Sequence, residues 1–85
     1  MQLGRVIGHA TSTIKHRSLN GWRLVVVQPV NVGRKPEADP VIAVDALGSG
    51  PGHLVVMNTD GLAARKVVGD EKTPVRFWVS GIVDE

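Results

Sequence analysis

Three short apolar runs constrain the fold of this 85-residue chain more than any other feature. They are residues 24–27, 41–44 and 54–57. All three are far shorter than the ~20 apolar residues that span a bilayer, and turn residues separate them, as is typical of β-strands. Because successive side chains of a strand point to opposite faces, an unbroken apolar run must be covered on both sides.

The pattern along the chain predicts five strands and one short helix. The strands are expected over residues 2–12, 22–32, 41–46, 53–58 and 75–84, and the helix over residues 60–66. Asp60 can cap the helix, and Arg65 and Lys66 suit its C-terminal end. We therefore expect an all-β fold, a small five-stranded OB-like β-barrel with one short helix, and a single domain over residues 1–85.

Alternation within the last strand predicts which of its side chains share a face. One face should carry Val75, Phe77, Val79, Gly81 and Val83, and the other Arg76, Trp78, Ser80, Ile82 and Asp84. One short helix cannot cover three strands that are apolar on both faces. The outward apolar side chains, Trp78 and Ile82 among them, would form a patch typical of an interface, which favours an obligate oligomer. The alternative is a barrel that curls enough to hide both faces.

A glycine-rich stretch joins two of the apolar runs and is expected to form a tight loop. Glycine suits positive φ and close approach of another backbone. Asp45 is expected to cap the amides of Leu47 and Gly48 rather than to act in catalysis. His53 either is an exposed residue at the end of the loop or lines an opening with Ser49. The candidate residues for a subunit interface or pore loop are Asp45, Gly48, Ser49, Gly50, Pro51, Gly52, His53, Trp78 and Ile82.

The sequence lacks the residue patterns of an enzyme. There is no cysteine, and the three histidines are scattered singly, so neither a disulfide nor a metal site is expected. Residues 48–52 have the wrong spacing for a dinucleotide fingerprint and lack the Lys-Ser/Thr ending of a phosphate loop. No Gly-x-Ser-x-Gly elbow occurs. We expect no catalytic residues and no cofactor.

The charge pattern argues against a dedicated nucleic-acid binder. Ten Lys and Arg oppose eight Asp and Glu, which gives a net charge of +2, and the basic residues are spread along the chain. The alternative is an OB-like module that binds single-stranded nucleic acid, with Trp22 and Trp78 as stacking platforms. Interface or core packing explains both tryptophans without nucleic acid. No signal peptide or membrane span is visible, so a cytoplasmic location without membrane contact is expected.

Several segments then match a known family in order and spacing. The segments are Leu3-Gly4-Arg5-Val6-Ile7-Gly8, Leu24-Val25-Val26-Val27-Gln28-Pro29, Val41 to Gly50 with Gly52, Ala64-Arg65, and Gly81-Ile82-Val83-Asp84. Nearly from end to end, the chain resembles the bacterial microcompartment vertex proteins, the family of carboxysome and ethanolamine-utilisation shell pentamers. It departs from the family at His53, where relatives often have an acidic residue, and at Arg76.

The resemblance implies a structural protein without catalysis or a required cofactor. Five copies would form a ring that closes the five-fold vertices of a polyhedral shell in the cytoplasm. A head-to-tail ring needs two different complementary patches on each subunit. The ring would dock against hexameric and pseudohexameric shell proteins, and we expect the docking rim to include Lys15, Arg17, Arg34 and Lys35.

Overall fold

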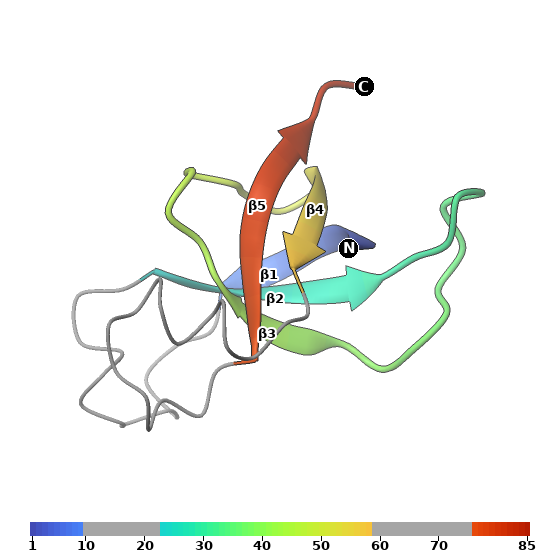
Figure 1. Ribbon diagram of the computed structural model, residues 1–85, viewed down its shortest axis with the longest axis horizontal. Helices are drawn as coiled ribbons and strands as arrows, with labels where there is room; N and C mark the ends of the chain where they lie inside the picture. The colour runs from blue at the N-terminus through green and yellow to red at the C-terminus, as the bar shows by residue number, and fades with distance from the viewer. Residues whose placement is uncertain (10–22, 59–75) are drawn as a thin grey trace.

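The computed structural model describes residues 1–9, 23–58 and 76–85. In this part of the chain, five strands close into a barrel in the spatial order β1-β2-β3-β5-β4 (Figure 1). The strands are β1 (Gln2–His9), β2 (Leu24–Pro29), β3 (Val41–Val44), β4 (Leu54–Asn58) and β5 (Phe77–Val83). The predicted all-β, five-stranded barrel is confirmed, and the described residues contain no helix. The helix predicted over residues 60–66 lies outside the described residues.

Antiparallel pairing connects most of the barrel. β1 pairs with β2 and β4, β2 with β3, and β4 with β5, all antiparallel. The exception is the parallel contact between β3 and β5, over the pairs Ala43↔Phe77 and Val44↔Trp78. This contact closes the barrel, so that the strands form one continuous cylinder instead of an open sheet with two edges.

β2, β3, β4 and β5 are shorter than the sequence predicted, whereas the predicted end of the first strand lies outside the described residues. β2 ends at Pro29 rather than at residue 32, because the chain turns directly after it. Arg34 donates its backbone N–H to the carbonyl of Asn31 at 2.9 Å and takes a positive φ of 68°. β3 ends at Val44 because Asp45, the next residue, binds loop amides with its side chain.

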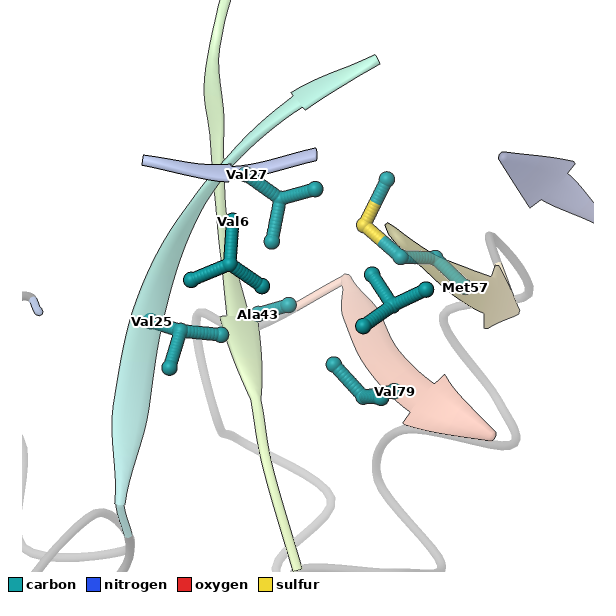
Figure 2. Packing of buried hydrophobic residues seen from close by; sticks show 7 residues of the cluster. Val6, Val25, Val27, Ala43, Met57 and Val79 are labelled. Atoms are coloured by element: carbon teal, nitrogen blue, oxygen red, sulfur yellow. The ribbon is translucent and has the colours of Figure 1, made fainter. Parts of the chain in front are cut away.

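All five strands contribute to one hydrophobic core. Its members are each at most 2% exposed, and most of them point toward one another in Figure 2: Val6, Val25, Val27, Ala43, Val55, Met57 and Val79. Val41 and Phe77 pack against this cluster. The alternating positions in β2 and β4 show that the inward faces of the strands follow the period of two expected for a barrel wall.

The outward faces of the apolar runs are only partly hidden. Val44 follows the core residue Ala43, and Leu54 precedes the core residue Val55. Both lie outside the core cluster, yet each is 1% exposed. Other outward side chains are half-buried, and Ile7 and Ile82 are 53% and 40% exposed. The barrel therefore hides part of its outward apolar surface itself and leaves another part open.

A bulge interrupts the pairing of β5 with β4. Pairing with β4 steps from Met57↔Val79 to Val56↔Gly81 and skips Ser80. An extra residue in one strand shifts the alternation that follows it. The exposure of β5 nevertheless alternates as predicted beyond the bulge: Ser80, Ile82 and Asp84 are exposed, whereas Gly81 and Val83 are half-buried.

Gly4 provides a test of the core packing. A Cβ at this position would overlap Cγ1 of Val27 and come within 3.1 Å of Cε of Met57. We expect Gly4→Ala to lower the free energy of unfolding by about 1–3 kcal/mol through overpacking. Gly8→Ala in the same strand is the control, since a Cβ there meets nothing within 4 Å. Urea denaturation measures both, and equal stability of the two variants would contradict this packing.

Candidate functional site

The carboxylate of Asp45 shapes the segment between β3 and β4, residues 45–53, which we call the glycine loop. Asp45 is 3% exposed. Its Oδ1 accepts the backbone N–H of Leu47 at 2.9 Å, and its Oδ2 accepts the N–H and hydroxyl of Ser49 at 2.7 and 2.9 Å. The predicted cap of Leu47 is confirmed. The second amide is that of Ser49, not Gly48, because the loop has turned far enough by Ser49 to face the carboxylate again.

Arg23, directly before β2, completes this network. Its Nη1 donates to Oδ2 of Asp45 and to the carbonyl of Ser49, and its Nη2 lies 3.3 Å from Nδ1 of His9. Sequence reasoning did not single out Arg23. The register of the sheet could have indicated it: Leu24 pairs with Val44, so Arg23 lies opposite Asp45 in the continued antiparallel pair.

The surroundings of Asp45 keep its carboxylate ionised. Burial raises the pKa of Asp45, but hydrogen bonds from Leu47 and Ser49 and the Arg23 guanidinium outweigh burial and hold the pKa below its ordinary value of 3.8. Every one of these contacts favours the charged form. The Asp45 carboxylate therefore serves as a hydrogen-bond acceptor for the loop and not as a general base.

The second half of the glycine loop is bound to β1 and to itself. Gly52 donates its N–H to the carbonyl of Val6 at 2.8 Å, and Val6 donates to His53 at 2.9 Å. Within the loop, His53 donates its N–H to Gly50 at 3.0 Å, while Nδ1 of His53 accepts the Gly50 N–H at 2.9 Å. Gly48 and Gly52 have φ of 84° and 91°, a region that L side chains avoid.

These contacts leave the glycine loop unsuited to a phosphate. A phosphate cradle presents several free backbone N–H groups to one anion. Here the N–H groups of Leu47, Ser49, Gly50, Gly52 and His53 all donate within the chain, and Pro51 has none. The structure therefore supports the conclusion from sequence that this is not a nucleotide-binding loop.

The remaining candidate residues lie at different places on the barrel. Trp78 in β5 is half-buried, pairs with Val44, and has a buried Nε1 without a hydrogen-bond partner within the described residues. Ile82 lines a groove of about 450 Å³ beside Gly52 and His53. His53 is exposed, whereas Ser49 is fully buried.

Only some of the predicted docking residues lie within the described part of the chain. Lys15 and Arg17 lie outside the described residues, as does Trp22. Arg34 and Lys35 are in the exposed turn between β2 and β3. Arg34 is engaged within the chain: it donates to the carbonyl of Val32 at 2.8 Å, and its Nε lies 3.7 Å from the Glu85 carboxylate.

Metal sites and membrane-spanning helices are both absent from the described ranges. Residues 1–9, 23–58 and 76–85 contain no group of three or more His, Cys, Asp or Glu side chains that could hold a metal ion. The same ranges hold no helix of the length and apolarity needed to cross a membrane.

Comparison with known proteins gives matches that span the chain. Residues 1–84 match the family described as ethanolamine utilisation protein EutN/carboxysome. The chain is 37% identical over 84 residues to the bacterial microcompartment shell vertex protein GrpN of Rhodospirillum rubrum, which covers 99% of this chain and 93% of that protein. These matches concern structural shell proteins rather than enzymes.

Solved structures give the same result. The ethanolamine utilization protein EutN matches with a TM-score of 0.85 and 33% identity, over 100% of this chain and 88% of that one. The GrpN pentameric microcompartment shell protein from Rhodospirillum rubrum matches with a TM-score of 0.82 and 35% identity, over 100% and 95%. Neither relative is described as a nucleic-acid-binding protein, so the alternative with stacking tryptophans gains no support.

Substitution of Asp45 tests the network of the glycine loop. We expect Asp45→Asn to lower the free energy of unfolding by about 2–3 kcal/mol, since an amide cannot satisfy all the donors that converge on the carboxylate. Asp39→Asn, in the exposed connection between β2 and β3, is the control and should be neutral. Urea denaturation at pH 7 measures both.

The pH dependence of stability gives a second readout of the same substitution. Because the folded pKa of Asp45 is lowered, its stabilisation is complete above the ordinary value of 3.8 and is lost as the pH falls through the folded pKa. The stability advantage of the wild type over Asp45→Asn should therefore shrink below about pH 4. An advantage that stays constant down to pH 2 would contradict an ionised Asp45.

Proposed function

Since the chain belongs to the ethanolamine utilisation protein EutN/carboxysome family, we propose that it is a structural shell protein of a bacterial microcompartment. Five copies form a cyclic ring that closes a five-fold vertex of the shell in the cytoplasm, and the chain catalyses no reaction. The observation that carries this proposal is the end-to-end likeness to shell vertex proteins, one of them pentameric. The single domain predicted for residues 1–85 is part of the proposal.

The glycine loop is suited to be a contact surface between copies. Its hydrogen bonds to Asp45, Arg23 and β1 fix its shape before any partner arrives. A surface that is already ordered loses little conformational entropy on association. We assign Gly48, Gly50, Pro51, Gly52 and His53 to the interface or the central opening, and Trp78 and Ile82 to the same interface. Asp45 and Ser49, both buried, hold the loop from behind.

Gly50 distinguishes a role in the ring from a role in the barrel. Its φ is not positive, and a Cβ there would meet nothing within 4 Å in its own chain. The fold of one chain therefore has no steric need for glycine at this position. If glycine is required at position 50 only in the assembled protein, a neighbouring copy must lie against it.

A second proposal concerns docking to neighbouring shell tiles. We propose that Lys15, Arg17, Arg34 and Lys35 contribute to a basic rim that contacts hexameric and pseudohexameric shell proteins. Within the described residues, Lys35 is exposed and has no ion-pair partner, whereas Arg34 is held beside Glu85. Lys35 is therefore the freer of the two for a contact outside the chain.

Native mass spectrometry of the wild type and of Gly50→Leu tests the ring. The wild type should be a pentamer at micromolar concentration. Gly50→Leu should keep the circular dichroism spectrum of the folded barrel and lose the pentamer, because the added side chain fills the space of the neighbouring copy. Asp39→Leu is the control and should assemble normally. A monomeric wild type would contradict the proposed function, and normal pentamers of Gly50→Leu would remove the loop from the interface.

Charge reversal tests the docking rim separately. We expect Lys15→Glu/Arg17→Glu/Lys35→Glu to form intact pentamers that fail to close shells, because the reversed charges weaken rim contacts but not contacts within the ring. Co-expression with the shell tiles, followed by electron microscopy, would show open vertices. Asp39→Lys, which also changes an exposed charge, is the control. Shells that close normally with the triple variant would place the docking surface elsewhere.

A further inference from the structure

We propose that a groove between the glycine loop and the end of β5 receives β1 of the next copy in the ring, with Ile7 as the inserted side chain. This inference rests on the proposed pentamer and names the contact that builds it. A closed ring of identical chains needs two different surfaces that fit each other. The two flanks of residues 52–54 provide one surface each.

The first surface is the groove of about 450 Å³. Its walls come from Gly52, His53 and Leu54 on one side and from Ile82, Val83 and the two acidic residues after β5 on the other. Leu54 pairs with Val83 across β4 and β5, which gives the groove an aliphatic lining. Ile82 is 40% exposed, so apolar surface remains uncovered at the groove in a single copy.

The second surface is the bulge of β1 around Ile7. Pairing of β1 with β2 steps from Val6↔Val27 to Gly8↔Val26, so Ile7 has no partner in β2. Its side chain is 53% exposed, and the residue after it is Gly8, which has no side chain to shield it. A bulge commonly re-aims a side chain. Here it leaves an isoleucine projecting from an otherwise closed barrel.

The positions of the two surfaces suit a ring. Val6 is bound to the backbone of Gly52 and His53 at 2.8 and 2.9 Å, and Leu54 is bound to β5. The bulge and the groove therefore lie on opposite flanks of one short segment.

The charges beside the two surfaces are complementary. Asp84 at the groove is exposed and has no ion-pair partner within the described residues, while Glu85 is neutralised by Arg5. On the same strand as Ile7, His9 contacts Arg23, whose side chain is paired with Asp45 and is 37% exposed. Asp84 of one copy can then lie beside the exposed part of the Arg23 side chain of the next copy.

The absence of cysteine from the chain permits a direct test by cross-linking. We expect Ile7→Cys/Ile82→Cys, after oxidation or treatment with a short bismaleimide, to give a ladder of covalent species up to the pentamer on a non-reducing denaturing gel. Val32→Cys/Ile82→Cys is the matched control, since Val32 is 83% exposed in the turn between β2 and β3. This control should give no ladder.

A charge swap keeps the inference falsifiable if the cysteines disturb assembly. Ile7→Asp and Ile82→Arg should each reduce the pentamer fraction by about tenfold or more, and the double variant should recover it, since aspartate then faces arginine in every contact. Native pentamers without a cross-linked ladder, or single variants that assemble like the wild type, would overturn this contact and leave the proposed function standing. A monomeric wild type would overturn both.

Discussion

The buried charge of Asp45 is the interaction on which the rest of this structure depends. An ionised carboxylate that leaves water must be matched by donors and an opposite charge. Here Leu47 and Ser49 supply the donors and Arg23 supplies the charge. The need to satisfy one side chain thereby fixes three things together: where β3 ends, how β2 begins, and which way the glycine loop turns. Loss of this carboxylate would release all three at once.

The residues of the glycine loop fall into a buried set and a set at the surface. Asp45 and Ser49 are buried and define the shape, while Gly50, Pro51 and His53 face outward or lie near the surface. The outward set can change without disturbing the buried set, as long as the Gly50 N–H keeps an acceptor. Nδ1 of His53 is that acceptor here. A carboxylate oxygen can do the same, so an acidic residue at this position is compatible with the same loop.

Sequence reasoning found what depends on local pattern and missed what depends on register. The apolar runs predicted the barrel strands, and the position of Asp45 after one of them predicted a cap of Leu47, because both features are local. Arg23 was missed because its approach to Asp45 follows from the pairing of β2 with β3. The bulge at Ser80 was missed for the same reason, since an extra residue in one strand is visible only beside its partner. The bulge at Ile7 did have a local signal, because Gly8 follows it and glycine inside a strand often marks a bulge.

The closed barrel limits what the described residues offer to a partner. Closure removes free strand edges, and the donors of the glycine loop are largely consumed within the chain. What stays open beside the loop is aliphatic surface at Ile7 and Ile82, with charge beside it. Such a surface has no group poised to react, but it can bury area against another rigid surface of complementary shape. Since the bulge and the groove differ, two copies leave one of each unfilled, and only closure of a ring satisfies every copy.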